Sequence, residues 1–419
     1  MVRELKHMEI GDIPVDWKLQ TFDETFRVIS NNTLSRENLN NRGGAVRNIH
    51  YGDILTKFPE VLDCNEEEIP YVNELSLLSS STQLLQDGDI VVADTAEDET
   101  VGKVIEVQNL GDSKLVAGLH TIPCRVKKGD FAPGWLGYYM NSDLFHNQIL
   151  PYITGIKVSS ISKGAISKTL ILVPPFDEQE KIVQSLNKIQ LLMTAETKVV
   201  NKIKLVKNGC LSKMFPQKDD TVPKMRLPGF TEAWEQRKLE DIYGSIGNAF
   251  VGTATPYYVE SGHFYLESNN IKDGQINHNT EVFINDEFYE KQKDKWLHTG
   301  DMVMVQSGHV GHAAVIPEEL NNSAAHALIM FRNPKKEIEP YFLNYQYQTL
   351  KSKKKIENIT TGNTIKHILA SEMQQFEVDM PELAEQKKIA EYFRALDHLI
   401  TLHQRESIFA FILKNITHL

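Results

Sequence analysis

The sequence predicts an α+β protein built from two related blocks, each followed by a long helix. Three observations support this prediction. Motifs recur in the same order in the two halves of the 419-residue chain. Within each half, short β-branched runs alternate with glycine-containing turns, which is typical of a twisted, mostly antiparallel sheet. After each half, apolar residues recur at alternating spacings of four and three, the pattern of a helix with one buried seam.

The composition is that of an ordinary globular protein, with 41% apolar and 24% charged residues. The chain contains no apolar run as long as a membrane span, and its opening residues MVRELKHMEIGDIP lack an apolar signal region, so we expect neither secretion nor a membrane segment. Three widely spaced cysteines, an odd number, favour a reducing, cytoplasmic compartment over a disulfide framework.

The net charge of −11 argues at first sight against nucleic acid, because phosphate contacts need Lys and Arg. The acidic residues are concentrated in the two blocks, whereas the helical stretches are basic or neutral. If DNA is the ligand, basic residues must therefore gather on one face.

The internal repeat determines the expected domain organisation. The first block opens around Trp17 and the second around Trp234. The matching segments that follow are 43–55 and 261–276, then 85–107 and 297–316, then 154–175 and 361–381. We therefore expect a first block at 1–174, a central helix with the start of a linker at 175–217, a second block at 218–380, and a C-terminal helix at 381–419.

Within the blocks, the local patterns predict individual elements. Residues 89–93 and 301–305 follow Gly-containing turns and predict a matched pair of strands, and 170–173 predicts another strand. Short helices are expected at 135–149 and 341–356. Pro174 and Pro175 then end the last strand of the first block, because proline cannot donate to a sheet but can begin a helix.

The two long helices carry matching seams at a constant offset of 207 residues. Glu196 and His403 interrupt the two seams at the same place. A seam of this kind must be buried, and the other helix is the nearest partner of similar length, so we predict an intramolecular pair. At about 1.5 Å per residue the central helix would span roughly 57 Å, the length of a spacer. The expected pairing residues are Ile182, Leu186, Ile189, Met193, Val200 and Ile203 on the first helix and Ile389, Phe393, Leu396 and Ile400 on the second.

Several motifs recur at matching places in the two halves: VPPFDEQEKI and DMPELAEQKKI at the helix starts, Trp17 and Trp234, and the Gly-Asp pairs at 88–89 and 300–301. Together these motifs resemble the specificity subunit of a Type I restriction-modification system. The resemblance implies that each block is a target recognition domain that reads one half of a split double-stranded DNA site. It also implies that the two helices pair as an antiparallel coiled coil and set the distance between the half-sites.

The same resemblance implies partners. Two methyltransferase subunits would dock on the chain, and a restriction translocase subunit can join them. The chain itself would not be a catalyst and would hold no cofactor, since S-adenosylmethionine and ATP are expected only on the partner subunits.

Loops that differ between the repeats are the best candidates for DNA contact. Arg suits guanine, Asn or Gln suits adenine, and Glu or Asp suits cytosine. The expected DNA-binding residues of the first block are Arg47, Asn48, Asp94, Thr95, Glu97, Lys157, Ser159 and Ser160. Those of the second block are Asn269, Asn270, Lys272, Gln306, Ser307, His309, Asn363, Thr364 and Lys366.

Two features leave alternatives open. The run from Lys351 to Lys355 is the densest basic run in the chain and is either a solvated helix face or a phosphate contact. Leu192, Val199 and Val206 form a second apolar stripe on the central helix. This stripe either widens the coiled-coil core or is a docking face for methyltransferase subunits.

Catalytic and metal sites are not expected. Val173-Pro174-Pro175-Phe176 is similar to an amino-methyltransferase motif, but valine cannot hold the target amino group, and no nucleotide-binding P-loop sequence is present. His309, His312 and His326 have only one histidine, His120, at the matching places of the first block, which does not favour a shared metal site. A self-contained DNA methyltransferase and a coiled-coil adaptor that binds only proteins are the alternative functions.

Overall fold

The structure is a computed structural model that describes residues 4–8, 10–155, 157–218, 220–362 and 366–416, with side chains described as far as residue 410. The chain divides into two compact units. The first consists of Met1–Glu196 with Glu406–Leu419, and the second is Thr197–Arg405. Each unit is taken by itself below.

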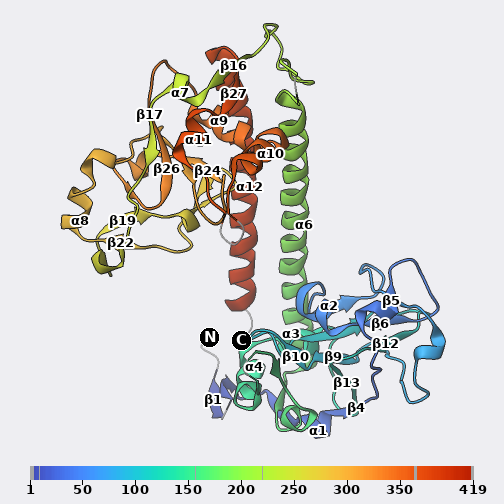
Figure 1. Ribbon diagram of the computed structural model, residues 1–419. Helices are drawn as coiled ribbons and strands as arrows, with labels where there is room; N and C mark the ends of the chain where they lie inside the picture. The colour runs from blue at the N-terminus through green and yellow to red at the C-terminus, as the bar shows by residue number, and fades with distance from the viewer. Residues whose placement is uncertain (1–3, 9, 156, 219, 363–365, 417–419) are drawn as a thin grey trace. The chain divides into compact units, whose positions relative to one another are not determined.

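The first unit is built mainly of short strands (Figure 1). In chain order they are β1 (Leu5–Met8), β2 (Gly11–Pro14), β3 (Lys18–Thr21), β4 (Phe26–Val28), β5 (Leu39–Asn40), β6 (Arg47–Ile49), β7 (Val61–Asp63), β8 (Tyr71–Val72), β9 (Ile90–Ala93), β10 (Thr95–Ala96), β11 (Val104–Gln108), β12 (Leu115–Ala117), β13 (Thr121–Val126), β14 (Ser159–Ser160) and β15 (Leu170–Val173).

These strands form one five-stranded sheet in the order β4-β13-β9-β11-β7 and one four-stranded sheet in the order β12-β6-β8-β5. The pairs β1-β2, β10-β14 and β3-β15 complete the unit. The pairings are antiparallel except for β7 with β11 and β6 with β12, which are parallel. This arrangement agrees with the mostly antiparallel sheet that the sequence predicts.

The second unit repeats much of this plan. Its strands are β16 (Glu235–Lys238), β17 (Tyr243–Asn248), β18 (Tyr258–Val259), β19 (His263–Leu266), β20 (Ile271–Lys272), β21 (Gln275–Ile276), β22 (Phe283–Ile284), β23 (Met302–Val305), β24 (Ala313–Val315), β25 (Ala324–Ala325), β26 (Leu328–Pro334) and β27 (Glu377–Met380). Its main sheet has the order β17-β26-β23-β24, which matches β4-β13-β9-β11 in the first unit. The pair β16-β27 likewise matches β3-β15, so the repeat predicted from sequence is present in the topology.

Short helices lie between the strands, and two long helices follow the two blocks. The short α-helices are α1 (Phe22–Thr25), α2 (Tyr51–Thr56), α3 (Trp135–Tyr139), α4 (Asp143–Ile149), α5 (Lys163–Ile166), α7 (Leu239–Ile242), α8 (Asp286–Glu290), α9 (Pro340–Tyr347), α10 (Leu350–Ile359) and α11 (Ala370–Gln374). The long ones are α6 (Phe176–Met214) and α12 (Leu383–Ile416). Among the described residues, no helix combines the length and apolarity needed to cross a bilayer.

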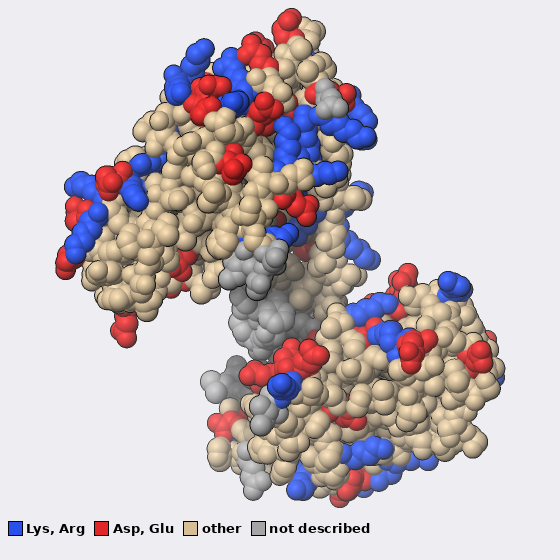
Figure 2. All heavy atoms as spheres, viewed as in Figure 1, with Lys and Arg blue, Asp and Glu red and all other residues tan. Residues whose placement is uncertain are grey.

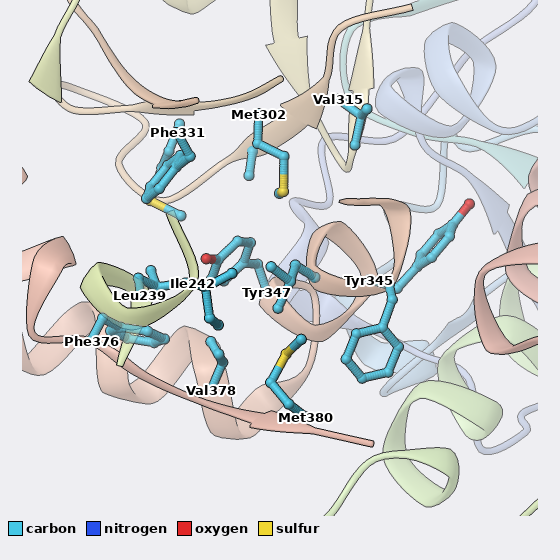
Figure 3. Packing of buried hydrophobic residues seen from close by; sticks show 14 of the residues in the cluster. Leu239, Ile242, Met302, Val315, Phe331, Tyr345, Tyr347, Phe376, Val378 and Met380 are labelled. Atoms are coloured by element: carbon cyan, nitrogen blue, oxygen red, sulfur yellow. The ribbon is translucent and has the colours of Figure 1, made fainter. Parts of the chain in front are cut away.

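Each block has an aromatic core that includes the start of its own long helix. In the first unit, Trp17 and Trp135 meet edge to face with ring centroids 6.0 Å apart, and Val183 and Leu186 of α6 pack in the same cluster. In the second unit, Tyr347 of α9 lies between the sheet residues Met302 and Val315 and the β27 residues Val378 and Met380 (Figure 3). Ile389 and Phe393 of α12 belong to that cluster.

A buried glutamine joins each block to its helix. Gln179 Oε1 accepts a hydrogen bond from Ala132 N at 2.9 Å, and its Nε2 donates to Pro174 O at 2.9 Å. At the equivalent position Gln386 accepts from Glu339 N at 3.1 Å and donates to Pro381 O at 2.8 Å. Each pair of equivalent residues is 207 positions apart. The EQ motif is therefore a structural joint that ties the last strand, a loop and the first helical turn together.

The glutamate of each EQ motif anchors the opening segment of its block. Glu178 Oε2 accepts from Trp17 Nε1 at 3.2 Å. Glu385, which is fully buried, accepts a bidentate pair from Arg226 at 2.8 and 2.7 Å. The two tryptophans used to align the repeats are both buried, so they are core residues.

Within the second unit, α6 and α12 pair in antiparallel orientation. Lys207 Nζ donates to Asp397 Oδ1 at 2.6 Å, and three residues further along α6 Cys210 Sγ lies 3.3 Å from Tyr392 OH. Phe215 then stacks obliquely against Phe393, with 6.0 Å between ring centroids. From the first of these contacts to the second, residue numbers rise from 207 to 210 on α6 and fall from 397 to 392 on α12, which confirms the predicted pairing of the two helices.

The predicted seam residues all face inward to some degree. Leu186, Val200, Ile389, Phe393 and Ile400 are buried, and the other five are half-buried. The second stripe differs, since Leu192 is 58% exposed and Val206 46%. It therefore does not widen a core within this chain.

We predict that Gln179→Ala loosens the first joint. The substitution leaves the Ala132 N–H and the Pro174 C=O without their partner, so the first unit should lose about 1–3 kcal/mol of stability. Backbone hydrogen–deuterium exchange at Ala132 should become faster accordingly. The control is Gln184→Ala, at an exposed position of the same helix. Equal exchange in both variants would contradict the joint.

Candidate nucleic-acid interface

Two loop segments meet at one edge of the first block. β10 pairs with β14 in antiparallel register, with Thr95 opposite Ser160 and Ala96 opposite Ser159. A further antiparallel bridge joins Thr154 to Ser160 and closes the 154–160 turn. The structure thus brings together four of the predicted residues, Asp94, Thr95, Ser159 and Ser160.

The turn between Thr154 and Ser160 needs glycine. Gly155 has φ +120°, and a Cβ there would lie 1.9 Å from the Val158 carbonyl oxygen. Lys157 stands exposed in this turn, and Glu97 is exposed just beyond β10. The edge therefore presents a cation, a carboxylate and hydroxyl groups on a backbone held by strand pairing.

The second block repeats this edge. Ser307 forms an antiparallel bridge with His367, which also bridges to Thr361. Gly308 N donates to Lys366 O at 3.1 Å, and Ile368 N donates to Gln306 O at 2.9 Å. These contacts join the predicted Gln306, Ser307, His309 and Lys366 in one surface. Asn363 and Thr364 lie outside the described residues.

The two edges correspond residue by residue. The Thr154–Ser160 bridge and the Thr361–His367 bridge are separated by the same 207 residues as the helix seams. In each block, the loop after the central strand pairs with the loop before the last strand. We call these two surfaces the readout edges, defined by residues 94–97 with 154–155 and 157–160, and by residues 306–309 with 361–362 and 366–367.

Three predicted residues lie in the interior and not at a readout edge. Arg47 is only 9% exposed, and its Nη1 donates to Cys64 O at 2.6 Å. Asn48 is fully buried and accepts from Asn32 Nδ2 at 2.7 Å. Asn270, 2% exposed, donates to Thr280 O at 2.7 Å and accepts from Glu267 N. These side chains serve the fold, and their burial does not favour base contact.

Asn269 and Lys272 are exposed but belong to a neighbouring turn. In that turn, Asp273 N donates to His312 Nδ1 at 3.2 Å, which ties it to the loop that follows the second readout edge. Burial lowers the pKa of His312, in keeping with a neutral ring whose Nδ1 accepts a hydrogen bond. Lys272 is thus close to the second edge, whereas Asn269 lies at the start of the turn.

Sequence reasoning missed His120 as a member of the first readout edge. Its Nδ1 lies 3.3 Å from Thr95 Oγ1 and 3.4 Å from Asp94 Oδ1, and its ring meets Tyr51 edge to face. The matching His326 lies 3.2 Å from Glu267 Oε1. A histidine paired with a carboxylate therefore recurs in both blocks. The available signal was the alignment of these two histidines in the repeat.

The arrangement can contact a polar polymer at two separate places. Each edge offers donors and acceptors on a fixed backbone, which is what hydrogen bonding to base edges in a DNA groove requires. Two non-identical edges, one on each block of a helix-linked repeat, define a two-block sequence-recognition protein.

The comparison with known proteins agrees with this class. The Type I restriction modification DNA specificity domain family matches the chain over residues 14–205 and 231–408. The chain belongs to that family, and it is a DNA sequence-recognition subunit of the Type I restriction-modification class. The resemblance identified from sequence is confirmed, and neither alternative function is favoured.

Two individual relatives from this comparison have low sequence identity to the chain. The putative type I restriction enzyme MjaX specificity subunit of Methanocaldococcus jannaschii is 24% identical over 407 residues, which cover 96% of this chain and 91% of the relative. The type I restriction enzyme MjaVIII specificity subunit of the same organism is 22% identical over 262 residues, 60% of this chain and 61% of the relative.

Two solved structures share the fold. The Type-I restriction-modification system S subunit from M. genitalium aligns with a TM-score of 0.59 at 12% identity, covering 96% of this chain and 95% of the other. A chain from a study of assembly and conformational transition in the type I R-M system aligns with a TM-score of 0.54 at 15% identity, covering 97% of both chains.

We predict that Thr95→Val combined with Ser160→Ala alters recognition of one half-site only. Loss of a base contact weakens binding by about 1–3 kcal/mol, so affinity for that half-site should fall roughly tenfold or more. Binding to duplexes randomised in one half at a time measures the effect. Thr56→Val with Ser167→Ala makes the same chemical changes away from the edge. A uniform loss over all sequences would argue against base readout by these residues.

Proposed function

We propose that this chain recognises a bipartite, asymmetric DNA site, with one half read by each block. The observation that carries the proposal is the pair of readout edges, which have matching backbone bridges but different side chains. The first presents Thr95, Ser159 and Ser160, whereas the second presents Gln306, Ser307 and His309. Different donors and acceptors read different bases, so two different half-sites follow.

Residues 1–174 and 218–380 are the two target recognition domains in this proposal. The range 175–217 contains the central spacer helix and the start of a linker, and the range 381–419 contains the C-terminal helix; these two helices hold the domains apart in the proposal. The buried glutamine joints support this role, because a spacer sets a distance only when its connection to each domain is stiff.

The partners we propose are two methyltransferase subunits, and a restriction translocase subunit can join this complex. Exposed apolar side chains on the long helices support a protein docking face, since large apolar patches are uncommon on free surfaces. In the first unit they are Leu191 and Leu192 of α6, and in the second unit they include Leu205 and Val206 of α6 and Leu399 and Leu402 of α12. The complex works in the cytoplasm, and the free, buried Cys64, Cys124 and Cys210 agree with a reducing compartment.

The chain itself is proposed to be non-catalytic and to bind no cofactor. Val173, at the first position of the methyltransferase-like motif, is the last residue of β15 and pairs with Lys18 in a strand. Its apolar side chain has no hydrogen-bonding group for a target base. S-adenosylmethionine and ATP are then the ligands of the partner subunits.

A reconstitution experiment tests this function. We expect the purified chain alone to bind no S-adenosylmethionine and to leave DNA unmethylated. Co-expression with its methyltransferase subunit should place methyl groups at a split motif, which methylome sequencing of the host reads directly. Methylation by the isolated chain, or a single undivided motif, would overturn the proposal.

A length change tests the spacer. Inserting seven residues after Glu196 and seven after His403 lengthens both helices by about 10 Å, because an α-helix rises about 1.5 Å per residue. The gap between half-sites should grow by about three base pairs of roughly 3.4 Å each, with both half-sites unchanged. In the control variant, the inserted sequences replace the seven residues after Glu196 and the seven residues after His403, so both helices keep their original length. An unchanged gap in an assembled complex would contradict the spacer role.

A further inference from the structure

Two helical segments of the second unit are rich in lysine although the chain as a whole is acidic. From Thr197 to Met214, α6 contains no Asp or Glu, and its cations are Lys198, Lys202, Lys204, Lys207 and Lys213. α10 contains Lys351, Lys353, Lys354 and Lys355 and one acid, Glu357. Figure 2 shows Lys and Arg side chains gathered over α10 and the neighbouring stretch of α6.

The lysines of α10 divide into two groups. Lys351 Nζ donates to Asp379 Oδ2 at 2.7 Å, and both side chains are only 11% exposed. Lys355 donates to Glu377 O at 3.2 Å and lies over the Phe376 ring. Lys353 and Lys354 are exposed, and their ammonium groups have no hydrogen-bond or ion-pair partner within the part of the chain that the structure describes. Only half of the basic run is therefore available to a ligand.

A cavity of about 470 Å³ lies where α6 and α10 approach each other. Lys204 of α6 and Lys353 of α10 both line it, together with the amide side chains of Asn208, Gln275 and Gln348. Lys207 also lines it but is neutralised by Asp397 at 2.6 Å. Asp273 is the other carboxylate of the lining. Among the described residues, neither the Lys204 nor the Lys353 ammonium group has an ion-pair partner, and the lining sets these two cations against one exposed acid, Asp273, together with neutral amide groups.

A second cavity, of about 440 Å³, connects this place to the second readout edge. It shares Gly311, His312 and Lys353 with the first cavity. Gly308, His309 and Lys366 of the readout edge line it as well, and Glu357 is its acid. Lys353 therefore stands between the residues proposed to read bases and the lysine of the spacer helix.

We propose that Lys204 and Lys353 hold backbone phosphates of the DNA that flanks the half-site read by the second block. The inference rests on the proposed function, because it takes the second readout edge as the place where bases are read. When a groove of the duplex lies against the second readout edge, the phosphates that border this groove lie over the protein surface next to the edge. Ammonium groups and amide N–H groups are the partners that phosphate oxygens take in protein–DNA complexes.

The spacer helix thus has a second role in this proposal. Lys204 belongs to α6, so a phosphate held there bonds the DNA to the element that sets the spacing. An acidic protein surface is the other ligand that such lysines suit, and the experiment separates the two.

The test measures DNA binding by the full chain as a function of salt. The variant Lys204→Gln with Lys353→Gln is compared with wild type on a duplex carrying the selected bipartite site and on a scrambled duplex of equal length. Each lost phosphate contact removes about 0.9 from the slope of log affinity against log salt. The slope should therefore fall by about 1.8, with affinity for both duplexes reduced by the same factor.

The matched control is Lys336→Gln with Lys388→Gln, which removes two charges from exposed positions of the same unit. Lys336 lines a different cavity, together with Glu232, Glu235 and Glu382, where a phosphate would be repelled. The control should keep the wild-type slope. Thermal melting checks that both variants are folded.

An unchanged slope in the Lys204→Gln, Lys353→Gln variant overturns the phosphate contacts. An unchanged slope with loss of co-purification of the methyltransferase subunit assigns the surface to protein docking, and so overturns them too. Failure of the proposed function looks different, since wild type would then bind the selected and scrambled duplexes equally. A reduced slope with preserved preference for the selected duplex supports the proposal.

Discussion

The hydrogen bonds of Gln179 and Gln386 are the constraint on which the rest of the structure depends. A glutamine side chain carries both an acceptor and donors. Each of these two accepts a hydrogen bond from the backbone N–H of another segment and donates one to the carbonyl of a proline at the strand-to-helix turn. The three segments that meet at the joint therefore cannot move independently without leaving a buried polar group unpaired, which costs about 1–3 kcal/mol. The direction of each long helix is fixed against its own block in this way.

Apolar and polar contacts make different contributions to the pairing of α6 with α12 in the second unit. Burial of Leu211, Met214, Phe215 and Phe393 supplies most of the favourable free energy, since a fully buried large apolar side chain contributes about 1.5–3 kcal/mol. The Lys207–Asp397 pair adds little net stability, because removing both charges from water offsets their attraction.

The ion pair between Lys207 and Asp397 instead fixes the register of α6 against α12. Asp397 also accepts from Tyr345 OH at 2.8 Å, so α6, α12 and α9 meet at one carboxylate. Burial and the Asp397 charge raise the pKa of Tyr345, which keeps its hydroxyl a donor. A shift of either helix by one turn would bury these groups without partners. A polar residue in a helix seam commonly selects one alignment in this way.

The acidity of the chain does not prevent DNA recognition, because electrostatic reach is short. At physiological salt the screening length is about 8 Å, so a phosphate responds mainly to the nearest charges. Around the second readout edge these are Lys204, Lys353 and Lys366 against Asp273 and Glu357. The net charge of −11 is a property of the whole surface, whereas the local balance at this edge is positive.

The sequence by itself determined the repeat, the two long helices and the strand-rich blocks. These depend on local periodicity, so 89–93 and 301–305 contain the matched strands β9 and β23, and the expected helices appear as α3 with α4 and α9 with α10. The seam positions also followed from spacing alone. Only the tertiary structure decided which polar side chains are available. Arg47, Asn48, Asn270, Lys351 and Lys355 resemble loop or surface residues in sequence, yet all five are engaged inside the fold. The physical reason is that the hydrogen-bond partner of a polar residue depends on which distant strands and helices pack against it. The spacing of residues along the chain does not show which distant elements these are.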